Sequence, residues 1–353
     1  MIGNKSALDK LYEGCVIPAC PLALDSKRML DEKHQRAILR YYMDAGVGGI
    51  AVGVHTTQFE IRKPEIGLFK PVLELASKEI EDYKKSTGKV IIKVAGVCGD
   101  IMQATSEAVL AKELGYDAVL LSPGGLSHLN EAQMLERTKE VAAILPVIGF
   151  YLQPAVGGKL FSFDYWEKLC AIENVVAIKS APLNRYQTLD LVRAATVSDR
   201  RDKIALYTGN DDNIVIDLLT KYKFTIEGKT YEKQFVGGLL GHWSVWTKRV
   251  VELFEVIKIE AKKDEISSAM FVLANEVTAA NAAFFDTANN FAGCIAGLHE
   301  VLRRQGLMKG IWCLNPKEKL SIGQLQEIDR VYKFYPHLND DEFVKNNLEK
   351  WLS

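Results

Sequence analysis

The 353-residue sequence lacks the patterns that mark a membrane protein, a secreted disulfide-rich protein or a zinc protein. No apolar run approaches the roughly 20 residues that a membrane-spanning helix needs. Six cysteines are present, but none forms a Cys-x-x-Cys pair, and the six histidines show no metal-binding spacing. We therefore expect free thiols and neither a metal nor another cofactor.

An excess of charge of one sign is also missing. The formal net charge is -1, so neither nucleic acid nor an anionic membrane is favoured as a partner. The first ten residues lack the hydrophobic core of a signal peptide, and we expect a cytoplasmic protein. The chain is 48% hydrophobic and 25% charged, and it is long enough for one large α/β domain with an appendage.

Short apolar segments alternate with amphipathic ones along the first 260 residues. The predicted strands cover residues 15–18, 49–53, 90–95, 118–121, 147–151, 174–180, 204–208 and 235–240. The predicted helices cover residues 31–45, 64–84, 101–114, 131–144 and 184–195. This order favours an α/β fold, the (β/α)8 TIM barrel, over an open doubly wound sheet, because no glycine-rich phosphate loop follows the first strand.

We expect residues 1–260 to form the barrel and residues 261–353 to form a C-terminal helical region packed on it. The pattern after residue 245 is almost entirely helical, which exceeds the single helix needed to complete a barrel. No Pro/Gly/Ser-rich linker separates the two regions. The polar stretch 220–234, with a turn at Gly228, is interpreted as an insertion or an exposed loop.

Residues 174–180, Asn-Val-Val-Ala-Ile-Lys-Ser, carry the most informative motif. The apolar run is typical of a strand buried on both faces, and Lys179 falls at its C-terminal end, where barrel active sites are built. Burial lowers the pKa of a lysine and gives a neutral amine that can form a Schiff base. The alternative is a lysine that reaches solvent or pairs with a carboxylate, and Lys179 alone does not decide.

Two neighbouring strand ends supply further polar groups. Tyr151 ends the strand 147–151, and by simple alternation we expect its phenol to converge with the Lys179 amine one strand along. Its alternative role is a barrel-filling aromatic. After the strand 49–53, Thr56 and Thr57 either bind a carboxylate or cap local backbone. His55 is either a proton carrier or a structural histidine.

Segments 149–154, 176–180 and 209–212, with Val-Gly-Gly at 236–238, make the sequence similar to the dihydrodipicolinate synthase / N-acetylneuraminate lyase family. The resemblance covers nearly the whole chain. It implies a (β/α)8 class I aldolase that forms a homo-oligomer (dimer or tetramer, usually a homotetramer) and acts on a 2-oxo acid. By this resemblance Lys179 is the Schiff-base lysine and Tyr151 the proton-relay tyrosine. The residues expected to bind substrate are Thr56, Thr57, Gln153, Gly209, Asn210 and Gly238.

The sequence also departs from the family. Val-His-Thr-Thr-Gln at residues 54–58 replaces the usual Gly-Thr-Thr-Gly-Glu, so His55 stands where a relay threonine would be and becomes a third catalytic candidate. Ser-Pro-Gly-Gly at 122–125 replaces a tyrosine of the synthases, and Val156 lies near the place of their arginine. Gln153, Val156 and Gly125 suggest an acceptor other than a second dicarboxylate.

We therefore expect a Schiff-base-forming lyase, an aldolase or dehydratase, that acts on a 2-oxo acid such as pyruvate or a 2-keto-3-deoxy sugar acid. The alternative is a family member that binds a 2-oxo acid and regulates without catalysing. A metal-dependent class II aldolase is disfavoured, because the sequence contains no metal-ligand spacing.

Overall fold

In the computed structural model, which describes residues 3–353, eight parallel strands lie in one sheet. In order across the sheet they are β1 (Val16–Pro18), β10 (Phe235–Leu240), β7 (Ala205–Thr208), β6 (Val175–Ala181), β5 (Val147–Leu152), β4 (Ala118–Leu121), β3 (Ile92–Val97) and β2 (Gly49–Val52). The two ends of this order are also linked, because Ala19 and Ala51 form a parallel bridge. The sheet therefore closes into a (β/α)8 barrel, which confirms the predicted fold class.

The chain divides into two compact units, and the first contains the residues up to Cys15 together with Ile92–Leu239. Its helices are α1 (Lys5–Glu13), α4 (Ile101–Glu113), α5 (Glu131–Ala142), α6 (Phe163–Ala171), α7 (Arg185–Val197) and α8 (Ile214–Leu219). Short polar residues begin several of them. Asp100 accepts a hydrogen bond from the Gln103 amide at the start of α4, and Asn130 forms a capping box with Gln133 at the start of α5.

Three helices of the first unit, α1, α6 and α8, are absent from the sequence prediction. Each spans nine residues or fewer, so the amphipathic period has little length in which to appear. The predicted strands agree more closely with the structure than the predicted helices do. Residues 118–121 and 235–240 are strands as predicted, and the other predicted strands are displaced by only one or two residues.

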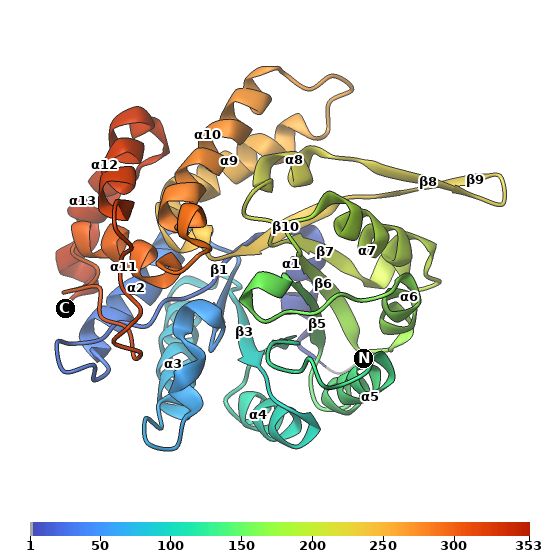
Figure 1. Cartoon of the computed structure of the whole chain (residues 1–353), viewed down its shortest axis with the longest axis horizontal. Helices are drawn as coiled ribbons and strands as arrows, with labels where there is room; N and C mark the ends of the chain where they lie inside the picture. The colour runs from blue at the N-terminus through green and yellow to red at the C-terminus, as the bar shows by residue number, and fades with distance from the viewer. Residues whose placement is uncertain (1–2) are drawn as a thin grey trace. The chain divides into compact units, whose positions relative to one another are not determined.

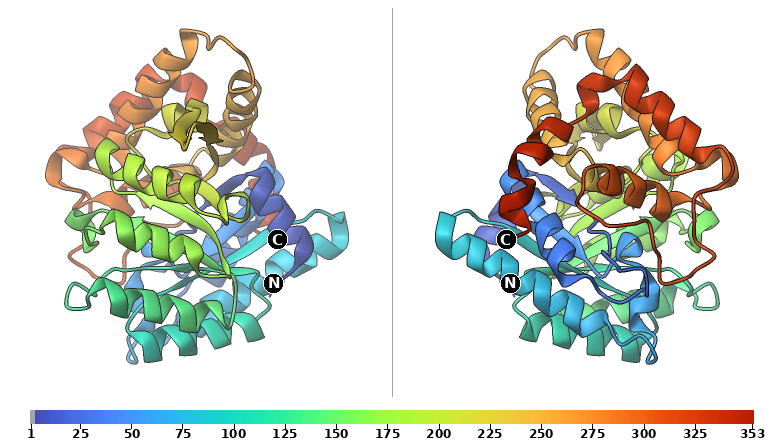
Figure 2. Two further views of the ribbon diagram at one scale, coloured as in Figure 1. Left: turned by 90° about the vertical axis from the view of Figure 1, so that its right-hand side faces the viewer. Right: turned by 90° about the vertical axis from the view of Figure 1, so that its left-hand side faces the viewer.

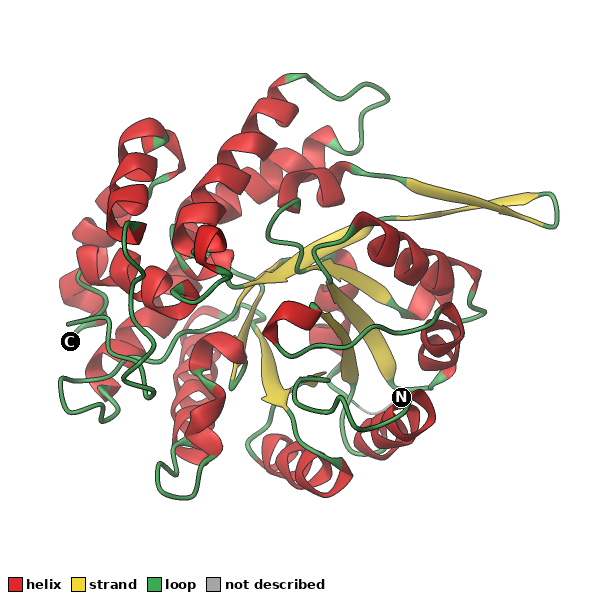
Figure 3. Ribbon diagram, viewed as in Figure 1, coloured by secondary structure: helices red, strands yellow, loops and turns green. Residues whose placement is uncertain are grey.

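Residues 220–234 form a β-hairpin, whereas the sequence indicated an insertion or an exposed loop. The antiparallel strands β8 (Tyr222–Ile226) and β9 (Lys229–Lys233) pass beside α7, and their turn projects from the first unit, as Figures 1 and 3 show. Glu227 (φ 50°) and Gly228 (φ 77°) make the two-residue turn, in which both positions need positive φ. The predicted turn at Gly228 is thus confirmed. The two strands beside it were not predicted, because their lysines and glutamates interrupt the apolar pattern by which a strand is identified.

The second unit contains Val16–Ile91 and Leu240–Ser353. Its helices are α2 (Glu32–Ala45), α3 (Phe69–Thr87), α9 (Thr247–Glu260), α10 (Ala269–Phe284), α11 (Cys294–Arg304), α12 (Gln324–Phe334) and α13 (Asp341–Trp351). The last four, α10 to α13, confirm the predicted C-terminal helical region, whereas α9 ends before residue 261, within the range predicted for the barrel. Within residues 3–353, no helix combines the length and apolarity needed to cross a membrane.

Helix α3 begins five residues later than predicted. Two 3₁₀ turns, His55–Thr57 and Phe59–Arg62, precede it. Pro71 then lies in its first turn, where the missing N–H group leaves no hydrogen bond unmade. The sequence prediction had placed the helix start at Pro64, the other proline of this segment.

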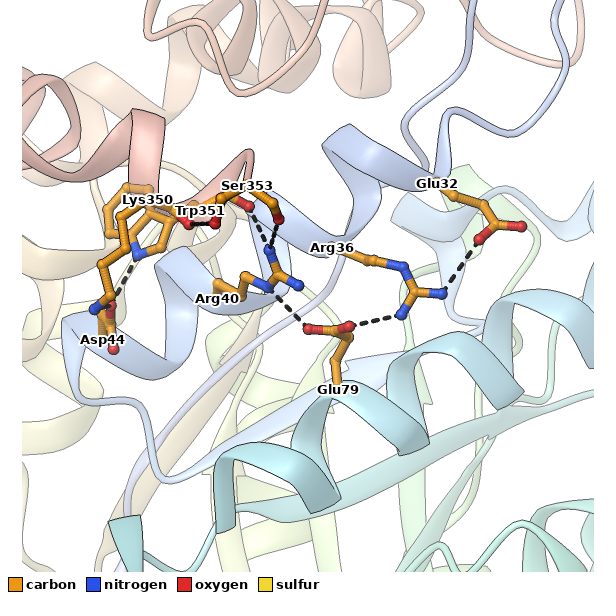
Figure 4. Close-up of polar contacts among 8 residues, drawn as sticks. All are labelled: Glu32, Arg36, Arg40, Asp44, Glu79, Lys350, Trp351 and Ser353. Carbon is orange, nitrogen blue, oxygen red and sulfur yellow. Dashed lines mark hydrogen bonds and ion pairs between the residues drawn. The ribbon is translucent and has the colours of Figure 1, made fainter. Parts of the chain in front are cut away.

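Helix α13 lies beside α2 and is held to it by a polar network (Figures 2 and 4). Arg40 of α2 donates to the carbonyl oxygens of Trp351 (2.8 Å) and Ser353 (2.9 Å). Glu79 of α3 accepts from both Arg36 (2.6 Å) and Arg40 (3.0 Å), and its side chain is only 11% exposed. Glu79 therefore orients the arginine that binds the end of the chain.

Replacing Glu79 by glutamine should lower the free energy of unfolding by about 1–3 kcal/mol, because two charge-assisted hydrogen bonds lose their anion. Urea denaturation followed by circular dichroism measures this change. Asp82→Asn is the matched control, since Asp82 is 59% exposed on the same helix and lies 3.9 Å from Lys85. Equal losses in both variants would show that the Glu79 network does not stabilise the fold.

Candidate active site

Lys179 and Phe150 are neighbours on adjacent strands and are the least buried residues of β6 and β5. They are register partners, and the Phe150 ring centre lies 4.4 Å from Lys179 Nζ. On the other side Lys179 pairs with Tyr207 of β7, whose hydroxyl donates to the Leu11 carbonyl oxygen (2.8 Å). Lys179, Phe150 and Tyr207 therefore share one face of the sheet.

The surroundings of Lys179 favour its neutral amine. Burial lowers the pKa of the Lys179 ammonium to about 8, although the negative charge of Asp211 acts in the opposite direction. An unperturbed lysine has a pKa of about 10.4, so a fall to about 8 raises the neutral fraction at pH 7 by a factor of about 10². An amine of this kind can attack a carbonyl carbon.

Gly209, which follows β7, leaves the space that the Lys179 side chain occupies. A Cβ atom at residue 209 would lie 2.4 Å from Lys179 Cε and 2.9 Å from the Ala181 Cβ. The Gly209 amide also donates to the Ser180 carbonyl oxygen (2.7 Å), which holds the two strand ends together. The structure thus brings Lys179 and Gly209, two residues expected at the site, into direct contact.

A buried carboxylate, Asp217 of α8, braces the segment that carries Gly209. Its Oδ2 accepts hydrogen bonds from Thr208 Oγ1 (2.7 Å) and Asn210 Nδ2 (2.9 Å), and its Oδ1 pairs with Arg185 (2.5 Å). Asn210 is fully buried, and its Oδ1 accepts from the Leu183 amide (3.1 Å). The Asn210 side chain therefore anchors the loop, which is a different task from the predicted substrate contact.

Tyr151 lies on the opposite face of β5 from the one expected. Its ring packs 4.8 Å from the Trp166 ring of α6, and a Cβ at Gly149, two residues earlier, would meet Leu169 of the same helix. The register explains the difference. Val147 pairs with Val175 but Ile148 pairs with Ala177, so a β-bulge places Phe150, and not Tyr151, beside Lys179. The simple alternation from which the convergence of phenol and amine was expected therefore does not hold between β5 and β6, and a role of Tyr151 in proton relay stays a prediction.

The Tyr151 hydroxyl already has a partner in its own surroundings. Tyr151 is only 1% exposed and lies among aromatic side chains, including Phe161, whose ring centre is 6.0 Å from its own. Burial raises the pKa of Tyr151, and a backbone hydrogen bond at Phe161 partly offsets that rise. This environment suits the alternative considered from the sequence, an aromatic packing residue.

Gln153 and Gly238 occupy backbone-defined positions in the first unit. The Gln153 carbonyl oxygen accepts from the Gly158 amide (3.0 Å), so Gln153 shapes the loop after β5. Gly238 of β10 pairs with Thr208, the residue that precedes Gly209. The Gly238 amide donates to the Cys15 carbonyl oxygen (3.3 Å). These contacts neither support nor contradict the prediction that Gln153 and Gly238 bind substrate.

In the second unit, Thr56 and Thr57 lie in the turn that follows β2, and both are buried. Thr56 Oγ1 donates to the Ala19 carbonyl oxygen (2.7 Å), and Thr57 Oγ1 donates to that of Cys20 (2.7 Å). Thr57 Oγ1 also accepts from the Gly53 amide (3.0 Å). Both hydroxyls therefore tie the ends of β1 and β2 together, as local capping predicts.

His55 begins the same turn, and its side chain is exposed. Its ring lies 5.9 Å from the Phe59 ring, and both residues line a cavity of the second unit together with Gln58 and Glu318. A role in proton transfer at this position stays a prediction.

The sequence prediction omitted Phe150, Asp211 and Asp217. A signal existed for Asp217, because it is the single charge in the apolar helix Ile-Val-Ile-Asp-Leu-Leu. Phe150 gave no such signal, since only the bulge between β5 and β6 turns it toward the lysine.

The dihydrodipicolinate synthetase family model matches residues 13–221, which is more than half of the chain. The chain belongs to this family. It is 24% identical over 310 residues to N-acetylneuraminate lyase 2 of Escherichia coli O6:H1, an alignment that covers 85% of this chain and 87% of the relative. It is 28% identical over 151 residues to 4-hydroxy-tetrahydrodipicolinate synthase of Clostridium novyi, covering 40% and 49% of the two chains.

Solved structures of the same family share the fold. A dihydrodipicolinate synthase from Oceanobacillus iheyensis superimposes with a TM-score of 0.74 at 16% identity, covering 93% of this chain and 99% of the other. An N-acetylneuraminate lyase from Fusobacterium nucleatum, solved as a complex with pyruvate, gives a TM-score of 0.69 at 18% identity and covers 91% and 97%. These similarities support the barrel and its helical extension.

Gly209→Ala should abolish or strongly weaken reaction at Lys179 while leaving the fold intact. The added methyl group would lie 2.4 Å from Lys179 Cε and 2.9 Å from the Ala181 Cβ, so the lysine side chain must move and the end of β6 must shift slightly. Reductive trapping of pyruvate should fall by about tenfold or more, and the overpacking should lower the free energy of unfolding by about 1–3 kcal/mol without unfolding the chain. Trapping at the wild-type rate would show that Lys179 needs no space at residue 209.

Tyr151→Phe should leave chemistry at Lys179 nearly unchanged, because the phenol faces α6. The measurement is exchange of the pyruvate methyl protons with deuterated solvent, followed by NMR. A positioned acid or base contributes about 10²–10⁴-fold to a rate, so a loss in that range would show that the Tyr151 hydroxyl reaches the substrate. Lys179→Ala is the negative control for exchange.

Proposed function

We propose that this chain is a Schiff-base-forming lyase that acts on a 2-oxo acid through Lys179. The observation that carries the proposal is a half-buried lysine at the C-terminal end of a barrel strand, with a pKa lowered to about 8 and a glycine that makes room for it. Membership of the dihydrodipicolinate synthetase family supports the same reaction class. The structure with pyruvate from Fusobacterium nucleatum supports a 2-oxo acid as ligand.

In the proposed reaction the neutral Lys179 amine attacks the C2 carbonyl carbon of the 2-oxo acid to give a carbinolamine, which takes up one proton from solvent and loses water to give a protonated imine. The imine cation withdraws electrons from C3, which stabilises the carbanion formed when the C3–C4 bond breaks or when C3 loses a proton. Both retro-aldol cleavage that releases pyruvate and dehydration of a 2-keto-3-deoxy sugar acid use this step.

Asp211 is the group whose negative charge acts on Lys179. We infer that this carboxylate stabilises the imine cation, because an anion close to a developing positive charge lowers its energy most where water is excluded. Tyr151 is not retained as the proton relay in this proposal, since it faces α6. His55 remains a candidate for proton transfer on the strength of the family resemblance alone.

The substrate carboxylate is proposed to bind at the turn of Thr56 and Thr57, as the resemblance implies. Both hydroxyl protons are donated to carbonyl oxygens, and the Thr57 amide donates to the Val54 carbonyl oxygen (3.0 Å), so the Thr56 amide would be the donor. Gly209 and Gly238 are proposed to let the substrate approach the backbone closely. A cytoplasmic location and assembly into a dimer or tetramer also remain predictions.

A second candidate function is 2-oxo acid binding without catalysis, in a regulatory member of the family. The observation that favours it is Phe150 in the position beside Lys179, where a phenol was expected. A protein of this kind would form the imine but would not break a bond to C3. Methyl-proton exchange in pyruvate therefore distinguishes the two candidates.

Borohydride added with pyruvate should leave one covalent adduct, located on Lys179 by peptide mass spectrometry. Trapping should become faster as pH rises toward about 8, since the amine loses its proton over that range, and should level off above it. Lys179→Ala should form no adduct, because it lacks the amine. Lys179→Arg should form none either, because a guanidinium stays protonated. An adduct of equal yield in Lys179→Ala would overturn the assignment.

A further inference from the structure

The β-hairpin of the first unit offers a strand edge for pairing. Its two strands, β8 and β9, form a sheet of their own, and both contact α7. Figures 1 and 3 show the turn of the hairpin projecting beyond the helices of this unit. A sheet of two strands alone is marginally stable, and an exposed strand edge can pair with a further strand.

The backbone groups of Lys223 and Thr225 lie on the outer edge of β8. The turn has two residues, so Ile226 and Lys229, which flank it, form a hydrogen-bonded pair, and such pairs recur at every second position along the hairpin. Lys223 and Thr225 fall between these positions, and their N–H and C=O groups point away from β9. Within residues 3–353, no backbone hydrogen bond joins either residue to a segment outside the hairpin.

Contacts at its base hold the hairpin on the first unit. Lys233 Nζ donates to the carbonyl oxygen of Ile204 (2.7 Å), and Gln234 Nε2 donates to that of Leu218 (2.7 Å). Both donors belong to β9 or to the residue that follows it, so neither contact covers the outer edge of β8.

The sequence at this edge is complementary to itself in an antiparallel arrangement. Residues 223–227, which include the first residue of the turn, are Lys-Phe-Thr-Ile-Glu, with Thr225 at the centre. When two copies pair about a two-fold axis at Thr225, each lysine lies opposite a glutamate and each phenylalanine opposite an isoleucine. Thr225 meets its own counterpart in a hydrogen-bonded pair, which its outward N–H and C=O groups allow.

The exposure of the side chains agrees with this register. Lys223, Thr225 and Glu227 are exposed, whereas Phe224 and Ile226, on the other face of the hairpin, are partly buried. Residues directly opposite each other in an antiparallel pair lie on the same face of the sheet. Charged side chains would therefore meet charged ones on one face, and apolar side chains would meet apolar ones on the other.

Strand β9 does not offer the same match. Residues 229–233 are Lys-Thr-Tyr-Glu-Lys, so pairing β9 with itself over its full length puts Lys229 opposite Lys233 at both ends. Like charges directly opposite each other destabilise a pair of strands. The charges thus favour the edge of β8, together with Glu227, and a second copy of this chain as its partner.

We propose that the β8 edge of one chain pairs with the β8 edge of a second copy, so that two hairpins form one four-stranded antiparallel sheet. The same surface serves both chains, which closes the pair and prevents further growth through this edge. This inference goes beyond the proposed lyase reaction and does not depend on Lys179. It assigns a surface to the predicted assembly into a dimer or tetramer.

Cross-linking of Thr225→Cys tests the register directly. Residue 225 and its counterpart would lie one strand spacing apart, about 4.8 Å, whereas residue 230 and its counterpart would lie three spacings apart, about 14 Å. A short bis-maleimide, whose arms reach across one spacing but not three, should link Thr225→Cys into a covalent dimer on a denaturing gel. Thr230→Cys is the matched control, because Thr230 lies beside Thr225 on the exposed face but belongs to β9.

The wild type, with its six cysteines, measures the background of this reaction. Thr230→Cys should give no dimer above that background. Equal yields of dimer in the two variants, or no dimer with Thr225→Cys, would overturn the proposal.

Exchanging the charges tests the partner. Glu227→Lys and Lys223→Glu each put like charges opposite one another at both ends of the pairing. The dissociation constant of the assembly, measured by sedimentation velocity on the full chain, should rise by about tenfold or more in either variant. Lys229→Glu, the control, changes the net charge as Lys223→Glu does but lies on β9, and it should assemble as the wild type does.

An equimolar mixture of Glu227→Lys and Lys223→Glu should recover most of the wild-type affinity, because every lysine at the pairing then faces a glutamate of the other chain. Circular dichroism checks that both variants fold. Loss of the pairing should halve the mass of the assembly, from two chains to one or from four chains to two. A wild-type chain that stays monomeric, unchanged affinity in both single variants, or no recovery in the mixture would contradict the proposal.

Discussion

The rest of the candidate site depends on one constraint, the burial of the Lys179 amine at the end of β6. A charged ammonium is costly away from water, so its pKa falls to about 8, and the groups around it must accommodate both the ammonium and the neutral amine. Gly209 supplies the space, and Asp217 fixes the segment on which Gly209 and Asp211 are carried. The loop after β7 therefore positions the Lys179 side chain, in addition to any contact that it makes with a substrate.

The β-bulge between β5 and β6 decides which aromatic residue meets that amine. Because side chains alternate along a strand, one additional residue in β6 exchanges the two faces of β5 relative to Lys179. Phe150 then lies against the lysine, and Tyr151 joins the cluster of Trp166 and Phe161. A protein that carries the tyrosine and the lysine of its family in sequence can therefore lack their convergence in space.

The turn after β2 shows the same separation between residue type and role. Thr56 and Thr57 are present as the family resemblance requires, yet their hydroxyls bind the carbonyl oxygens of Ala19 and Cys20. The next residue, Gln58, takes a backbone conformation suited to glycine, and within residues 3–353 its side-chain amide nitrogen has no hydrogen-bond partner. The residue types at this strand end therefore do not determine which groups remain available for binding.

The sequence by itself determined the barrel, the C-terminal helices and the position of Lys179, because these follow from hydrophobic period and strand order, which are local and repeated. It also predicted the turn at Gly228, although the flanking charges concealed β8 and β9. Only the tertiary structure decided that Tyr151 faces α6 and that the Asn210 side chain donates a hydrogen bond to Asp217. Register and hydrogen-bond pairing join residues distant in sequence, and a single bulged residue changes them without altering any local pattern.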